Sequence, residues 1–365
     1  MDETYMRRAL ELAELGRGLV SPNPLVGAVV VSGSEIVGEG YHEGAGKPHG
    51  EVIAIQAAGN RSRGATLYVT LEPCNHFGRT PPCTDAILSA GIARVVAAIP
   101  DPNPAVDGGG MAKLGEGGVE VVSDVLPIEA TRQNESFLKF VSTGRPFVTL
   151  KLAATLDGKI AARDGSSTWI TSDEARADVH RLRGASDAIV AGSGTVLADD
   201  PRLTVRDPDY RGTPALRVVA DARGRVSNTA GVFDGTAPTL VATTDASDAD
   251  RRESWASKGA DVVICRPGPD GGVDLVDLLA ALGGRGIQSA LLEGGSTLAF
   301  AAVREGIVDK LFLYLAPKLL GGSDAPGILG GKGFTTLQDA REVEITKVDR
   351  VGPDLRLEAY VHRDS

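Results

Sequence analysis

The feature that most constrains the fold of this chain is a regular alternation of short apolar runs with amphipathic segments, interrupted once at Gly144-Arg145-Pro146. Short apolar runs bounded by turn residues predict strands, and apolar residues at helical spacing predict helices. A chain of 365 residues is long enough for about two domains of roughly 150 residues each. Because strands and helices alternate on both sides of the break, we expect two layered α/β domains, over residues 1–144 and 146–365.

The alternation assigns individual segments in both domains. The first domain is expected to hold helices over residues 4–15, 51–58, 84–90 and 128–141, strands over residues 26–31, 35–40, 67–71, 94–99 and 119–122, and a Gly-rich loop over residues 107–118. The second is expected to hold strands over residues 147–152, 188–191, 217–220, 239–242, 261–264, 290–293 and 311–315, helices over residues 173–183, 274–282 and 297–305, and a closing hairpin over residues 342–362.

Composition and charge exclude several classes of protein. Lys and Arg number 38 against 48 Asp and Glu, and the net charge of −10 leaves no overall basic field for nucleic acid. No apolar run approaches the ~18 residues that span a bilayer, and the acidic start is unlike a signal peptide. Three cysteines, Cys74, Cys83 and Cys265, are too few for a secreted disulfide framework. We therefore expect a cytoplasmic protein without a membrane or nucleic-acid partner, in which Cys265 is structural.

The strongest chemical signal lies in the first domain, where His49-Gly50-Glu51 is followed by Pro73-Cys74 and Pro82-Cys83. One imidazole and two thiolates form a three-ligand set suited to zinc. Three protein ligands leave one tetrahedral position for water, whose pKa zinc lowers toward ~7. Glu51 stands outside the ligand set, and its carboxylate can take a proton from water and deliver it to a leaving amine. The pattern therefore predicts zinc-dependent hydrolytic deamination.

This metal site has structural alternatives. Zinc deaminases commonly space their two cysteines three residues apart, whereas Cys74 and Cys83 are nine apart. The set could instead form a closed zinc site, or the cysteines could be ordinary buried residues. His76 is a rival fourth ligand that would close the site, but its polar loop is better suited to contacting substrate. The Glu51 offset and the Pro before each Cys favour catalysis.

Three polar residues near these motifs are candidates for substrate contacts: Asn23 in Ser-Pro-Asn-Pro, His42 in Gly-Tyr-His, and Asn103 in Asp-Pro-Asn-Pro. An Asn amide donates and accepts hydrogen bonds together, which matches the edge of an amide-bearing heterocycle. The alternative is turn chemistry, because Pro-flanked Asn is common in turns.

Four stretches of the first domain carry a family resemblance: SPNPLVGAVVV, VGEGYHEGAGKPHGEV, TLEPCNHFGRTPPCTDAI and DPNP. They resemble the deaminase domain of the bifunctional riboflavin-biosynthesis deaminase–reductases, and the nine-residue cysteine spacing matches that branch better than cytidine or tRNA-adenosine deaminases. The resemblance implies a cytidine-deaminase-like three-layer α/β/α domain. It implies zinc on His49, Cys74 and Cys83, a proton shuttle at Glu51, and substrate contacts from Asn23, His42, His76 and Asn103.

The sequence departs from this family at a few positions. Gly50 stands where the family usually has Ala, and Arg79 stands where many members have Lys. Neither change removes a functional group, although Gly50 is expected to loosen the helix start by a few tenths of a kcal/mol or more.

The second domain lacks a dinucleotide fingerprint, because no G-x-G-x-x-G follows a strand anywhere in the chain. A different phosphate site is indicated where an apolar strand at Leu291-Leu292-Glu293 runs into Gly294-Gly295-Ser296-Thr297 and a helix. Exposed N–H groups at such a helix start can bind phosphate. An ordinary strand–turn–helix is the alternative.

The same family resemblance continues through TLKLAATLDGKI, STWIT, TVLADDP and LTVR, in family order. It implies a dihydrofolate-reductase-like α/β domain that uses NADPH. Ala222 stands where relatives often have Ser, so that any hydroxyl contact there is lost. The resemblance implies cofactor contacts at Ala153, Trp169, Thr195, Asp199, Gly295, Ser296 and Thr297, and substrate contacts at Ser167, Arg183, Leu203, Arg206 and Glu293, with Lys151 beside them.

Residue chemistry agrees with a phosphosugar substrate for this domain. Arg183 and Arg206 can each fork onto phosphate oxygens, although surface charge is the alternative for both. Trp169 is either a core residue or a cofactor platform. Lys151, Glu293 and water are open candidates for the proton donor, and the residues do not decide between NADPH and NADH.

Together the two domains predict two consecutive steps on one pathway. Residues 1–144 are expected to replace a ring amino group of a diaminopyrimidinone ribosyl phosphate with oxygen, and residues 146–365 to reduce the ribosyl ring to a ribityl chain with NADPH. Order and substrate come from the resemblance, and the hydrolytic chemistry comes from the residues. The rivals are a nucleoside or deoxynucleotide deaminase fused to an unrelated reductase, and a zinc-stabilised nucleotide-binding regulator. The sequence leaves open whether the protein forms a homo-oligomer.

Overall fold

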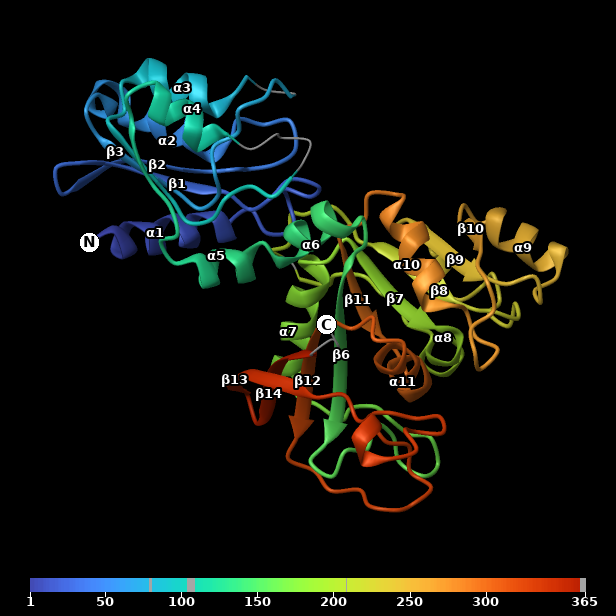
Figure 1. Ribbon diagram of the computed structural model, residues 1–365. Helices are drawn as coiled ribbons and strands as arrows, with labels where there is room; N and C mark the ends of the chain where they lie inside the picture. Colours follow the sequence, from blue (N-terminus) through green and yellow to red (C-terminus); the bar gives the residue numbers. More distant parts are fainter. Residues whose placement is uncertain (79–80, 104–108, 208, 362–365) are drawn as a thin grey trace. The chain divides into compact units, whose positions relative to one another are not determined.

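The computed structural model describes residues 1–78, 81–103, 109–207 and 209–361. The chain forms two compact units, Met1–Gly144 and Arg145–Ser365, and most of their helices and strands are labelled in Figure 1. Arg79, one of the departures from the family pattern, lies outside the described residues. Within the described residues, no helix combines the length and the apolar character needed to cross a bilayer.

The first unit is built on a five-stranded sheet in the order β2-β1-β3-β4-β5, in which β1 runs antiparallel to β2 and β3, and β3, β4 and β5 run parallel. Its strands are β1 Gly27–Ser32, β2 Glu35–Tyr41, β3 Thr66–Val69, β4 Arg94–Ala97 and β5 Glu120–Val122. Its helices are α1 Asp2–Glu14, α2 Gly50–Ala58, α3 Cys83–Ala90, α4 Gly110–Glu116, α5 Pro127–Gln133 and α6 Glu135–Thr143, with a 3-10 turn η1 at Gly59–Ser62.

Helices cover both faces of this sheet, as Figure 1 shows. Successive side chains of a strand point to opposite faces, so Val30 of β1 packs with residues of α2, α3 and α4, whereas its neighbour Val29 packs with residues of α1, α5 and α6. Both valines are fully buried. The expected three-layer α/β/α arrangement is therefore confirmed.

Two expectations for the first unit are wrong. The loop expected over residues 107–118 contains helix α4 in its described part, because Leu114 is fully buried in the sheet core and Gly110 lets the helix approach Pro73 closely. A Cβ at position 110 would lie 1.9 Å from the Pro73 carbonyl oxygen. The single helix expected over 128–141 is broken at Asn134, whose side chain accepts from Leu25 N–H at 2.8 Å and donates to Leu25 O at 2.9 Å.

The second unit is built on a nine-stranded sheet in the order β10-β9-β8-β7-β11-β6-β12-β14-β13. Neighbouring strands from β10 to β12 run parallel, and β12, β14 and β13 run antiparallel. Its strands are β6 Phe147–Thr155, β7 Ala188–Gly192, β8 Leu216–Ala220, β9 Thr239–Thr243, β10 Asp261–Ile264, β11 Ser289–Glu293, β12 Lys310–Ala316, β13 Val343–Val351 and β14 Asp354–Val361. Its helices are α7 Asp173–Gly184, α8 Ser193–Asp199, α9 Ala249–Ala256, α10 Leu275–Gly283 and α11 Ser296–Arg304, with 3-10 turns η3 Gly231–Phe233 and η4 Leu337–Asp339.

Both faces of this larger sheet are also covered. Leu240 and Val241 are neighbours on β9 and point to opposite faces, Leu240 into the cluster that includes α10 and α11, and Val241 into the cluster that includes Trp255 of α9. The expected closing hairpin is confirmed over the described residues as β13 and β14. The sequence pattern did not predict α8 or α9, because α8 begins in a Gly-Ser-Gly segment and α9 buries only Trp255.

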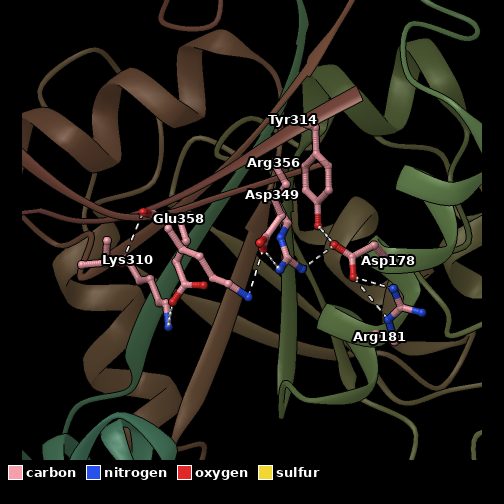
Figure 2. A network of polar contacts seen from close by, with 9 residues as sticks. Asp178, Arg181, Lys310, Tyr314, Asp349, Arg356 and Glu358 are labelled. Carbon is pink, nitrogen blue, oxygen red and sulfur yellow. Dashed lines mark hydrogen bonds and ion pairs between the residues drawn. The ribbon is translucent and has the colours of Figure 1, made fainter. Parts of the chain in front are cut away.

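A polar network ties helix α7 to the C-terminal strands, as Figure 2 shows. Asp178 of α7 accepts hydrogen bonds from the Tyr314 hydroxyl at 2.7 Å and from Arg356 at 2.8 Å, and Arg356 also donates to Asp349 at 2.6 Å. Burial alone would raise the pKa of Asp178, but the bonds from Tyr314, Arg181 and Arg356 hold it below its ordinary value. An ionised carboxylate therefore joins α7 to β12, β13 and β14.

Candidate active sites

Three segments of the first unit bring His49, Cys74 and Cys83 together. His49 directly precedes α2, Cys83 is the first residue of α3, and Cys74 lies in the loop after β3. Their ligand atoms all lie within 4.8 Å of one another, and His49 Nδ1 is 3.2 Å from Cys83 Sγ and 3.6 Å from Cys74 Sγ. Zinc bonds of about 2.0–2.3 Å put tetrahedral ligand atoms within roughly 4 Å of each other, so this arrangement suits one shared ion.

The surroundings of Cys74 favour its thiolate form. Hydrogen bonds from Cys83 and His49 lower the pKa of Cys74 well below that of a free thiol. The backbone N–H of Cys83, at the start of α3, donates to Cys74 Sγ at 3.4 Å. A metal-binding cysteine must be deprotonated, and this environment therefore prepares Cys74 for that role.

Glu51 lies in the first turn of α2 and is only 3% exposed. Burial raises the pKa of its carboxyl group, and its Oε2 atom has no hydrogen-bond partner among the described residues. A buried polar atom without a partner is costly unless a ligand or water satisfies it. The three-ligand set and this unpartnered oxygen together fit a zinc ion with a water.

Asn23 and His42 lie next to this cluster. His42 Nδ1 is 3.2 Å from the Pro48 carbonyl, which can only accept, so that His42 Nε2 accepts from Asn23 Nδ2 at 2.9 Å. Burial lowers the pKa of His42 and favours its neutral form. The His42 and His49 rings meet edge to face, with centroids 5.3 Å apart. The structure thus brings two of the expected substrate-binding residues to the metal site.

His76 and Asn103 are the other two residues expected to contact the deaminase substrate, and their surroundings differ from each other. His76, two residues after Cys74, has a buried Nδ1 atom without a partner among the described residues, which fits a ligand contact. The backbone N–H of Asn103 bonds to Asp101 Oδ1 at 2.9 Å, as in a turn. Sequence reasoning missed Glu72, which accepts from the N–H groups of Asp101 and Met111 and so anchors the loop that carries Asn103. The only signal for Glu72 in the sequence was a carboxylate directly after the strand expected over residues 67–71.

A cavity of about 600 Å³ opens at the carboxyl ends of β7, β8 and β11 in the second unit. Ligands of open parallel sheets bind at this edge. The Thr195 hydroxyl accepts from Gly295 N–H at 2.8 Å and so connects the start of α8, which follows β7, to the turn that follows β11. Of the seven expected cofactor residues, four line this cavity: Thr195, Gly295, Ser296 and Thr297.

Three arginines also line the cavity, and the sequence pattern assigned none of them a role: Arg223, Arg225 and Arg304. Arg225 donates to Ser193 Oγ at 2.7 Å, and Arg304 is paired with Asp270. Arg223 forms no hydrogen bond or ion pair with any described residue. The signal available in the sequence was the Arg-Gly-Arg run just after the expected strand over residues 217–220.

A buried charged group lies at the centre of the sheet. Arg183 forks onto Glu293, with Nε to Oε1 at 2.6 Å and Nη2 to Oε2 at 2.9 Å, and both side chains are about nine-tenths buried. Lys151 of β6 is the register partner of Glu293 on β11. Burial lowers the pKa of Lys151, although the charge of Glu293 opposes this. Three expected substrate residues are thus brought together.

The remaining expected reductase residues lie elsewhere. Trp169 is 63% exposed beneath the Arg176 guanidinium, 4.4 Å from its ring centroid, so the core alternative for Trp169 is wrong. Leu203 packs into the core and is 3% exposed, which leaves its backbone to meet a ligand. The described residues that line the cavity do not include Ala153, Trp169 or Asp199. The roles of these residues and of Ser167 and Arg206 stay predictions.

Two protein-family models match separate parts of the chain. Residues 1–99 match a model described as the cytidine and deoxycytidylate deaminase zinc-binding region, and residues 146–357 match the RibD C-terminal domain. Fold and site therefore define a class of protein in which a zinc-binding deaminase domain is joined to a reductase domain.

Similar proteins cover nearly the whole chain. The riboflavin biosynthesis protein RibD of Escherichia coli is 46% identical over 98% of both chains, and that of Bacillus amyloliquefaciens is 44% identical over 98% of this chain and 96% of its own. The solved structure of Acinetobacter baumannii RibD has a TM-score of 0.89 at 37% identity, and a deaminase/reductase from Thermotoga maritima has 0.87 at 37%, each over 99% of both chains. The chain belongs to the RibD family of bifunctional deaminase–reductases of riboflavin biosynthesis.

Proposed function

We propose that the first unit deaminates 2,5-diamino-6-(5-phosphoribosylamino)pyrimidin-4-one, and that the second reduces the ribosyl group of the product, 5-amino-6-(5-phosphoribosylamino)uracil, to a ribityl chain with NADPH. The observation that carries this proposal is the convergence of His49, Cys74 and Cys83 beside the unpartnered, buried Glu51 oxygen. The description of the T. maritima relative names the corresponding deaminase and uracil reductase activities, which supports the choice of substrates.

Each side chain of the deaminase site has one task. His49, Cys74 and Cys83 would hold zinc, which supplies a Lewis acid that activates water for attack. Glu51 takes the proton released as water attacks the ring carbon and delivers it to the leaving amine, so that ammonia departs. Asn23, fixed by neutral His42, offers its amide to the pyrimidinone edge. His76 and Asn103 complete the substrate contacts.

The cavity of the second unit supports a phosphorylated dinucleotide as the cofactor. Thr195 and the turn over residues 295–297 would hold the pyrophosphate. Since Gly295 N–H already donates to Thr195, the N–H groups of Ser296 and Thr297 at the start of α11 would meet it. Arg223, whose guanidinium has no partner among the described residues, takes the 2′-phosphate that distinguishes NADPH from NADH. The cofactor supplies the hydride, and the protein positions it.

The buried charged group positions the sugar. Arg183 is committed to Glu293, so Arg206, which is exposed and free of ion pairs with described residues, is the better ligand for the substrate phosphate. The side-chain amine of Lys151 forms no hydrogen bond or ion pair with the described residues, and burial lowers its pKa. This amine is the group best suited to deliver a proton to the opening ribose ring.

The test is incubation of the zinc-loaded full chain with the diaminopyrimidinone phosphosugar, with and without NADPH, followed by mass spectrometry. We expect the mass change of an amino group replaced by oxygen without NADPH, and a further gain of two hydrogens with it. Cytidine and deoxycytidine monophosphate serve as competing substrates. Deamination of either in preference to the phosphosugar, or no turnover of any of the three, would reject the proposal.

A further inference from the structure

Helix α7 holds the segment over residues 203–206 at two adjacent backbone groups. Arg183 Nη1 donates to the Thr204 carbonyl at 3.0 Å, and the backbone N–H of Arg206 donates to His180 Nδ1 at 3.2 Å. His180 and Arg183 are three residues apart and therefore lie on the same face of the helix. Leu203 anchors the start of this segment in the core. The path of the backbone is therefore fixed up to Arg206.

The hydrogen bond at Arg206 also fixes the state of the His180 ring. A backbone N–H can only donate, so His180 Nδ1 accepts and Nε2 carries the ring proton. A protonated imidazole would lose this acceptor. Burial lowers the pKa of His180, as do the charges of Arg183 and Arg206, and the opposing charges of Glu293 and Asp207 do not outweigh them. The neutral ring that this contact needs is therefore favoured at neutral pH.

The side chain of Arg206 contrasts with its fixed backbone. The residue is exposed, and its guanidinium has no hydrogen bond or ion pair with any described residue. Arg183 of α7, by contrast, donates to the Glu293 carboxylate and to the Thr204 carbonyl. A fixed backbone confines the guanidinium to the reach of one side chain, so less freedom is lost when it binds an anion. A guanidinium can also donate two hydrogen bonds to one phosphate.

We propose that His180 is a positioning residue of the reductase, which holds the Arg206 backbone so that the Arg206 guanidinium meets the phosphate group of the substrate. The inference rests on the proposed function, in which Arg206 binds that phosphate. It goes further by naming the residue that sets the affinity of the site for a phosphorylated substrate rather than for its dephosphorylated form. His180 itself touches neither the reacting atoms nor the cofactor in this account.

The test compares His180→Ala with His180→Asn, because the Asn amide oxygen can replace the Nδ1 acceptor. We expect His180→Ala to raise KM for the phosphorylated uracil substrate about tenfold, while kcat and KM for NADPH change less than about twofold. His180→Asn should recover most of this loss. With the dephosphorylated substrate, all three proteins should have the same KM. Arg181→Ala removes a neighbouring positive charge on α7 and should leave KM unchanged.

A double-mutant cycle separates this inference from the proposed function. If His180 acts through Arg206, His180→Ala should add almost nothing in an Arg206→Ala background. Fully additive effects, an equal loss with the dephosphorylated substrate, or a failure of Asn to rescue would overturn the positioning role. Arg206→Ala with unchanged KM for the phosphorylated substrate would instead reject the proposed phosphate contact itself. Urea unfolding of each variant shows whether a loss of activity reflects a loss of fold.

Discussion

At the level of single residues, we predict that deamination depends on the Glu51 carboxylate, which our proposal places outside the metal ligand set. Glu51→Gln keeps the shape of the side chain but removes its capacity to carry a proton, so we expect ammonia release to fall at least about 10²-fold. Zinc content, measured by elemental mass spectrometry, should stay at the level of the unchanged protein. Reductase activity with the deaminated product serves as the control and should be unaffected. Retained deamination would reject the shuttle role.

A second residue-scale prediction concerns the choice of cofactor. Arg223→Ala should raise KM for NADPH about tenfold, because a charge-assisted contact to the 2′-phosphate is lost, and should leave KM for NADH unchanged. Initial rates with both cofactors at saturating substrate provide the measurement. Arg285→Ala is the matched control, since Arg285 forms a surface pair with Asp261 away from the cavity. Equal losses with both cofactors would contradict the assignment.

At the scale of elements, glycines of β2 allow α2 to approach the sheet closely enough to place His49 and Glu51. A Cβ at Gly38 would lie 2.1 Å from the Ala54 carbonyl oxygen and 2.7 Å from the Ala58 nitrogen, both on α2. Gly38→Ala should therefore destabilise the first unit by about 3 kcal/mol, as overpacking does, and weaken zinc retention. Denaturant unfolding measures the first effect and elemental analysis the second.

The control for this glycine lies in the same unit. Gly115 lies inside α4, and a Cβ there would meet Val121 Cγ2 at 3.9 Å and no other described atom outside its own helix within 4 Å. Gly115→Ala should stabilise the unit by roughly 0.5–1 kcal/mol, because Ala favours the helix. Stabilisation by Gly38→Ala would show that α2 can shift away from the sheet without cost.

The network at Asp178 predicts how acid affects the second unit. Since the folded pKa of Asp178 lies below its ordinary value, its contribution to stability is complete above about pH 4 and is lost as the pH falls through the folded value. Asp178→Asn should cost about 2 kcal/mol at pH 7 and flatten the decline in stability below pH 4. Urea unfolding across this range gives the measurement. Asp250→Asn is the control, because Asp250 is exposed on the first turn of α9; it should change neither the stability at pH 7 nor the decline in stability below pH 4. An unchanged acid profile for Asp178→Asn would contradict the stabilising role of the Asp178 carboxylate.

At the scale of the whole molecule, each unit has a sheet and a hydrophobic core of its own. Removal of zinc with a chelator should therefore lower the unfolding midpoint of the first unit by about 5 °C or more, because a ligand that binds only the folded state stabilises it. The second unit should respond to NADPH instead. Differential scanning calorimetry with each ligand tests this. A single transition that both ligands shift equally would contradict independent cores.

Periodicity predicted most strands and several helices, because alternating apolar residues record which face of a sheet is buried. It failed where packing between distant segments decides the conformation. Leu114 and the close approach of Gly110 to Pro73 make a helix of a Gly-rich stretch. Asn134 breaks a helix because its amide bonds to the Leu25 backbone, 109 residues away. A local sequence pattern around Gly110 does not include Pro73, and one around Asn134 does not include Leu25.

The types and spacing of side chains along the chain were enough to propose a metal ligand set and a proton carrier, at His49, Cys74, Cys83 and Glu51. The fold was needed to show which polar side chains have hydrogen-bond or ion-pair partners and which have none among the described residues. Arg183 and Arg206 look alike in the sequence, yet Glu293 occupies the first and nothing described pairs with the second. Arg223 likewise becomes a candidate ligand only in the folded chain, because strands distant in sequence end beside it and form the cavity that it lines. The physical reason is that pairing and desolvation depend on neighbours in space, which chain order does not record.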